Sequence, residues 1–69
     1  MNLETIGNWA GLVWTALNSA EEATLTVKAL KKATKLKEKE IYAALGWLAR
    51  EGKLAIAETE TDINVTLIG

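Results

Sequence analysis

The side chains able to do chemistry in this sequence are mainly lysines, and they are unevenly distributed. All eight basic residues lie within residues 28–53, together with three of the nine acidic residues, so this window has a net charge of +5. The segments before and after it carry −3 each. Ammonium and guanidinium groups are the main ligands of nucleic-acid phosphates, so the window indicates contact with a phosphate backbone.

Seven of the basic residues are candidates for phosphate contact, because they lie on two predicted helices and the turn between them. They are Lys28, Lys31, Lys32, Lys35, Lys37, Lys39 and Arg50. The alternative interpretation is a solvated lysine-rich surface, which is common in small soluble proteins. The net charge of the whole chain is −1, which argues against a general nucleic-acid coat.

Trp47 is the residue that the helical pattern explains least well. With Ile41, Leu45 and Leu48 directed to the core, Trp47 lies well off that direction. One interpretation is that Trp47 folds sideways over its own domain and closes a small core. The other is a contact patch for a second chain, since exposed aromatic residues beside small ones are typical of interfaces.

Two sets of residues are therefore candidate protein interfaces. One lies on the predicted helix 38–51, and the other on the predicted N-terminal helix, which we expect to be the more important. They comprise Tyr42, Ala43, Gly46 and Trp47, and Trp9, Leu12 and Ala16. A domain of 69 residues buries only about 60% of its surface, so we predict a weak to moderate homodimer.

Enzymatic chemistry is not expected, because the chain has neither His nor Cys. The usual general base, the thiol nucleophile and the commonest metal ligands are thus missing. The acids Glu58, Glu60 and Asp62 lack the glycine and the closing Glu of a calcium loop. We expect no cofactor, no metal and no small-molecule substrate.

The elements that must position the lysines begin with a helix over residues 3–18, which Asn2 can cap. Its apolar residues follow the 3.6-residue period as one stripe: Leu3, Ile6, Ala10, Val13, Trp14 and Leu17. Gly7 and Gly11 weaken this helix by up to about 1 kcal/mol each relative to Ala. The expected reason for them is the close packing of another element.

After an extended piece at 23–25, the pattern predicts a helix over 27–34 capped by Thr26, and a turn at 35–37 with Leu36 buried. A helix over about 38–51 follows; Lys37 is a poor cap for it, and Gly52 ends it. Strands at 54–60 and 63–68 with a turn at 61–62 form a hairpin. We therefore predict one α+β domain over residues 1–69, a winged helix-turn-helix with elements in the order α-β-α-α-β-β.

The stretch with the most specific resemblance is TVKALKKATKLKEKEIYAALGWLAREGKL, residues 26–54, and within it residues 44–51 followed by Lys53. It resembles a family of short bacterial winged helix-turn-helix proteins of uncharacterised function, found mostly in Bacteroidetes. The resemblance covers nearly the whole chain. It implies the fold, a transcription-factor ancestry and pairing as homodimers.

The resulting functional hypothesis is a small cytoplasmic regulator of transcription that contacts double-stranded DNA mainly through phosphates. Two features oppose base recognition: Ala43 and Gly46 cannot hydrogen-bond a base edge, and three acids surround the predicted wing tip. The alternative is a winged-helix module that binds protein and not DNA. The chain has no apolar run long enough to span a bilayer, and its start lacks the basic residues of a signal peptide.

Overall fold

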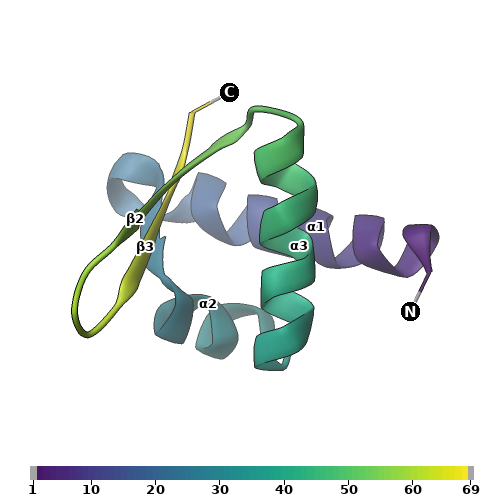
Figure 1. Cartoon of the computed structure of the whole chain (residues 1–69), viewed down its shortest axis with the longest axis horizontal. Helices are drawn as coiled ribbons and strands as arrows, with labels where there is room; N and C mark the ends of the chain where they lie inside the picture. The colour runs from purple at the N-terminus through teal and green to yellow at the C-terminus, as the bar shows by residue number, and fades with distance from the viewer. Residues whose placement is uncertain (1, 69) are drawn as a thin grey trace.

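The computed structural model describes residues 2–68 as three helices that pack beside a small antiparallel sheet (Figure 1). The elements run in the order α1 (Leu3–Ser19), a short 3₁₀ turn (Glu21–Ala23), β1 (Thr24–Thr26), α2 (Val27–Thr34), α3 (Glu38–Arg50), β2 (Leu54–Glu58) and β3 (Ile63–Leu67). This is the predicted α-β-α-α-β-β order, and the fold is a winged helix domain of the α+β class. The hairpin β2–β3 is the wing.

Helix α1 begins at the predicted cap, where the Asn2 side-chain oxygen accepts a hydrogen bond from the Thr5 N–H at 2.8 Å. Only Ala10, Val13 and Leu17 of the predicted stripe are buried. Leu3 is 71% exposed, because the first turn of α1 extends beyond the side of α3 in Figure 1.

The two tryptophans of α1 differ in burial from what the sequence predicted. Trp9, placed on the flank by the periodicity, packs against the core, whereas Trp14 is 40% exposed. Both lie at similar angles on opposite sides of the buried stripe, so helical spacing alone does not distinguish them. The core extends over one flank of α1, and that flank carries Trp9.

The glycines of α1 are not explained by close packing within the chain, contrary to the sequence-based expectation. A Cβ atom built on Gly7 or on Gly11 would have no atom of the described residues within 4 Å, apart from its own helix backbone. The same holds for Gly46 on α3. These three positions could therefore hold a larger residue within this subunit.

Helices α2 and α3 form the helix-turn-helix unit, and their ends are set by local hydrogen bonds. The Thr26 hydroxyl accepts from the Ala29 N–H at 3.1 Å and starts α2 at its predicted residue. Leu36, in the turn, is half-buried and packs against the core. Lys37 has no side-chain acceptor for capping, but the Glu40 carboxylate accepts from the Lys37 N–H at 2.7 Å and secures the start of α3.

Helix α3 ends in a Schellman motif around Gly52, which has a φ of +72°. The Gly52 N–H donates to the Ala49 carbonyl, and the Lys53 N–H donates to the Leu48 carbonyl, each at 3.0 Å. The chain then enters β2 directly at Leu54. The glycine thus fixes the direction in which the wing leaves the helix.

The sheet has the strand order β1-β3-β2, with both pairs antiparallel. Strand β2 ends two residues earlier than predicted, because Thr59 forms a turn with Asp62, and β3 ends one residue earlier than predicted, at Leu67. The Thr59 hydroxyl donates to the Asp62 carbonyl and accepts from the Asp62 N–H, both at 3.0 Å. The turn therefore spans residues 59–62, not only 61–62.

The core lies between the helices and one face of the sheet, and α1 packs mainly on α3. Its fully buried large side chains are Val13, Leu17, Leu30, Ile41 and Val65. Among residues 2–68, no helix has the length and apolar character required to cross a membrane.

Candidate nucleic-acid interface

The orientation of α3 is the one that the sequence predicted. Ile41, Ala44, Leu45 and Leu48 are all buried, at 4% exposure or less. On the opposite side, Lys39, Gly46 and Arg50 are exposed and Ala43 is half-buried. Helix α3 therefore offers a face with a basic residue near each end and two small residues between them.

The basic residues of α2 and of the turn add to this face. Lys28, Lys31 and Lys32 on α2, and Lys35 and Lys37 in the turn, are all exposed. Together with Lys39 and Arg50 they are the seven residues predicted from the sequence, and none is buried in the subunit. We call these seven residues the basic surface.

Lys35 has an unusual backbone conformation for a lysine. It ends α2 in the left-handed region, with φ 61° and ψ 17°, and its N–H donates to the Lys31 carbonyl at 2.8 Å. Glycine and asparagine are the usual residues at such a position. The sequence carried no signal for this conformation, because lysine is not a residue that favours it.

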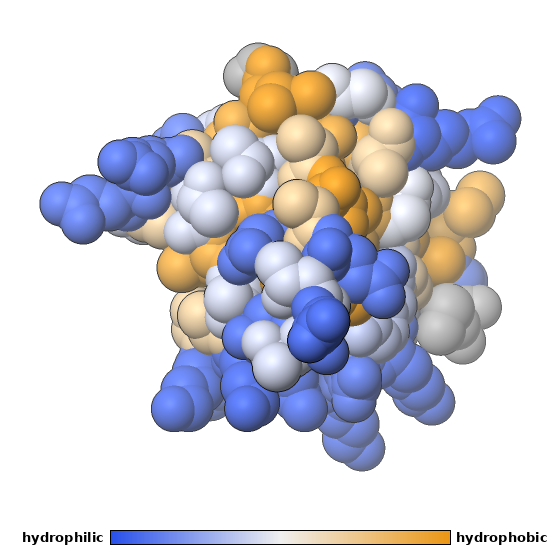
Figure 2. Space-filling model, turned by 60° about the vertical axis from the view of Figure 1, so that its left-hand side comes forward, coloured by the Kyte–Doolittle hydropathy of each residue, from blue (hydrophilic) through white to orange (hydrophobic). Residues whose placement is uncertain are grey.

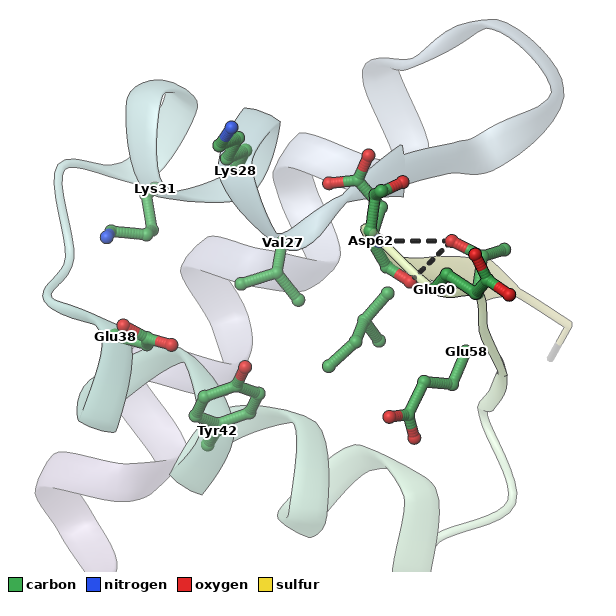
Figure 3. A pocket seen from close by; sticks show the side chains of 11 residues that line it. Val27, Lys28, Lys31, Glu38, Tyr42, Glu58, Glu60 and Asp62 are labelled. Carbon is green, nitrogen blue, oxygen red and sulfur yellow. Dashed lines mark hydrogen bonds between the residues drawn. The ribbon is translucent and has the colours of Figure 1, made fainter.

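A groove separates α2 and the start of α3 from the wing, and its two walls have opposite charge (Figure 3). Lys28 and Lys31 of α2 lie on one side, and Glu58, Glu60 and Asp62 of the wing lie on the other. The groove has a volume of about 320 Å³. A phosphate backbone placed here would meet the lysines on one side and repulsive carboxylates on the other.

Tyr42 lies on the α3 side of this groove, close to acids of both α3 and the wing (Figure 3). Partial burial and the nearby Glu38 carboxylate raise the pKa of Tyr42 above its usual 10.0, and Glu58 adds to the effect. The side chain is nevertheless 43% exposed. Tyr42 is thus a neutral hydroxyl at a surface where the wing and the helix-turn-helix unit meet.

Trp47 does not lie on the free face of α3. It is half-buried, packs against the core, and faces α1 in a groove that Gly7, Gly11 and Trp14 also line. Trp47 thus folds over its own subunit, against α1, in a groove that Glu51 also lines.

The other candidate interface residues divide into two groups. Trp9 and Ala16 pack partly against the core of their own subunit. Leu12 and Tyr42 are 49% and 43% exposed, and Gly46 is exposed as well. The structure therefore leaves Leu12 on α1, and Tyr42 and Gly46 on α3, as the more accessible members of those sets.

Metal chemistry has no centre in the described part of the chain. Within residues 2–68, no three Asp or Glu side chains converge in a group that could hold a metal ion. The acids of the wing are instead spread along its tip: Glu58 lies just before the turn, and Glu60 and Asp62 lie in it.

Two comparisons with known proteins bear on this chain. A family model described as "Winged helix-turn-helix domain (DUF2582)" matches residues 1–67. The solution NMR structure of protein BT2368 from Bacteroides thetaiotaomicron has 33% sequence identity and a TM-score of 0.82, over 97% of this chain and 79% of that one. No curated protein matches the sequence.

Proposed function

Because the chain belongs to the winged helix-turn-helix domain family DUF2582, we propose that it binds double-stranded DNA through phosphate contacts of its basic surface. The observation that carries this proposal is the exposure of all seven basic residues along α2, the turn and α3. In a helix-turn-helix, the second helix enters the major groove and the preceding helix crosses the backbone. The proposal assigns phosphate contacts to the lysines of α2 and the turn, and Lys39 and Arg50 lie at the two ends of α3.

The contribution of base recognition should be small. Ala43 and Gly46 occupy the centre of the exposed face of α3, and neither side chain has a hydrogen-bonding group. Ala43 can at most contact a thymine methyl group. We therefore propose a DNA-binding protein of low sequence specificity, acting in the cytoplasm as a regulator of transcription and as a homodimer.

The test is a binding titration with a mixed-sequence DNA duplex at several salt concentrations. The logarithm of the affinity should fall linearly with the logarithm of salt concentration, by about 0.9 for each phosphate neutralised. Changing Lys31, Lys32 and Lys35 together to Gln should weaken binding strongly and lower this slope by up to about 3. Lys53→Gln is the matched control, because Lys53 lies outside the basic surface, and it should change the slope little.

The alternative function is a protein-interaction module that does not bind DNA. The half-exposed Leu12 and Tyr42, and the open space beside Gly46, favour it, since partly exposed apolar residues next to small ones suit a protein contact. Amide shifts that stay unchanged on addition of duplex DNA at low salt would support this alternative and contradict the DNA proposal.

A further inference from the structure

The groove between α2 and the wing, which suits a phosphate backbone poorly, has the size of a small-molecule site (Figure 3). Its volume of about 320 Å³ lies at the lower end of the range of about 300–1,000 Å³ that is typical of such sites. It is lined by residues from α2, from the start of α3 and from the wing. A small molecule placed here would contact all three elements.

The floor of the groove is apolar. Val27 at the start of α2 is buried, and Ile63 at the start of β3 is half-buried. In Figure 3, Val27 lies between Lys31 of α2 and Asp62 of the wing, and the ring of Tyr42 lies below it. These side chains can support the uncharged middle of a ligand whose ends reach the two walls.

The two walls of the groove differ in charge. Lys28 and Lys31 are exposed on α2. The wing carries the acids Glu58, Glu60 and Asp62 and no basic residue. Figure 2, with the wing side turned forward, shows a hydrophilic cluster at the front and a row of hydrophilic side chains along the lower side, where Figure 1 places α2 and the start of α3. The electric field across the groove therefore runs from α2 to the wing.

The start of α3 adds negative charge to the groove. Glu38 lies there beside Tyr42, and partial burial, Glu38 and Glu58 together raise the pKa of Tyr42. The lining as a whole contains four acids and two lysines, which is a net charge of −2. An ammonium group should therefore be held more strongly in this groove than a carboxylate.

Neither a simple anion nor a simple cation matches this arrangement, because each would be attracted by one wall and repelled by the other. We propose that the groove binds a small zwitterion, such as a short peptide with free ends. Its carboxylate lies toward Lys28 and Lys31, and its ammonium group lies toward Glu58 and the acids of the turn. Its uncharged middle rests on Val27 and Ile63.

Occupation of the groove has a consequence for the DNA binding proposed above. Lys28 and Lys31 belong to the basic surface, so the carboxylate of the ligand competes with phosphates for them. This consequence rests on the proposed function, whereas the binding of the zwitterion does not.

Triglycine is a suitable probe, and amide shifts of the full chain during a titration locate its site. The shifts should concentrate at residues 27–31, at Tyr42 and at residues 58–63, with a Kd of about 1 mM, as expected for a ligand of this size. The amides of α1 should stay unchanged. An absence of shifts at about 10 mM triglycine, ten times the expected Kd, or shifts confined to residues outside the groove, would overturn the inference.

Blocking one end of the peptide at a time tests the two walls separately. N-acetyl-triglycine lacks the ammonium group and should bind at least about threefold more weakly than triglycine. Triglycine amide lacks the carboxylate and should be weakened less, because the lining is net negative. Binding of the amide as tight as that of triglycine would indicate a plain cation site and contradict the inference, as would equal binding of the acetylated peptide.

Variants that remove one charge link the effect to the named residues. Lys28→Gln and Glu60→Gln should each raise the Kd of triglycine about twofold to fivefold, which is the range for exposed ion pairs. Lys53→Gln and Glu51→Gln are the matched controls, because these two residues line a different groove, and they should leave the Kd unchanged. Equal effects of the two pairs of variants would overturn the assignment to the groove between α2 and the wing.

A DNA titration in the presence of triglycine separates this inference from the proposed function. A zwitterion has no net charge and does not screen phosphates as a salt does, so weaker DNA binding would report competition for the lysines. If triglycine binds and DNA does not, the proposed function fails and the inference stands. If DNA binds and triglycine does not, the inference fails and the proposed function stands.

Discussion

At the scale of single residues, the basic surface includes one residue whose type does not favour its backbone conformation. Lys35 holds a left-handed conformation that L-amino acids other than glycine adopt at a cost of about 1–2 kcal/mol. The sequence predicted the turn and the charge at this position, because lysines cluster there. It could not predict the conformation, since that is imposed by Leu36 packing into the core and by the start of α3 at Glu38.

Replacing Lys35 by Gly should raise the free energy of unfolding by up to about 1 kcal/mol, because glycine relieves the strained φ. Urea denaturation followed by tryptophan fluorescence measures this change. Lys35→Ala is the control that removes the same charge and keeps the Cβ atom, and it should not stabilise the protein. Equal effects of the two substitutions would mean that charge, and not backbone strain, determines stability at this position.

Tyr42 should ionise above the usual pKa of 10.0, and the chain contains no other tyrosine to obscure its phenolate absorbance. Because burial and nearby carboxylates disfavour the phenolate, the folded state holds its proton longer than the unfolded state does. Stability should therefore fall as pH rises from 10.0 through the folded pKa. Glu38→Gln should lower the pKa of Tyr42 more than Glu58→Gln does, and an ultraviolet titration measures both shifts.

At the scale of elements, the sequence predicted best where a local cap decides the boundary. Helix α2 begins at its predicted residue because Thr26 caps it, and α3 ends near its predicted residue because Gly52 takes a positive φ. Strand β2 ends two residues earlier than expected, since side-chain bonding of Thr59 to Asp62 overrides the alternation of residue types. The burial of Trp9 in preference to Trp14 depends on how α1 lies across its neighbours, which periodicity does not encode.

The open space beside Gly7 and Gly11 predicts that α1 tolerates alanine at both positions. Gly7→Ala and Gly11→Ala should each raise the free energy of unfolding by up to about 1 kcal/mol, because alanine is the better helix former. Thermal unfolding followed by circular dichroism gives the comparison. Gly52→Ala is the contrasting variant and should destabilise, since its φ of +72° is strained for alanine. A loss of stability in Gly7→Ala would mean that the glycine is needed for close packing after all.

At the scale of the whole molecule, the basic and acidic segments of the sequence lie on opposite sides of a groove. The basic window and the acidic C-terminal segment were evident from the sequence. Their approach at Lys28 and Lys31, opposite Glu58 and Asp62, was not, because α2 and the wing are brought together only by the fold (Figure 3). The basic and acidic residues could thus be named from the sequence, and the position of the acids opposite the lysines of α2 required the structure.

Neutralising the wing should leave DNA binding unchanged or make it stronger. Glu58→Gln, Glu60→Gln and Asp62→Asn, combined in one variant, remove three carboxylates that face the lysines of α2 and would repel a phosphate backbone. Fluorescence anisotropy with a labelled duplex at low salt compares this variant with the parent. Weaker binding by the neutral variant would mean that the wing contacts DNA in some way other than through phosphates.

The Schellman ending of α3 has a mechanical consequence. Only Gly52 and Lys53 lie between the Glu51 cap of α3 and the first residue of β2, and both donate hydrogen bonds back into the last turn of the helix. The connection between α3 and β2 is therefore short and fully hydrogen-bonded to the helix. A change in the tilt of α3 should therefore be passed on to the start of the hairpin.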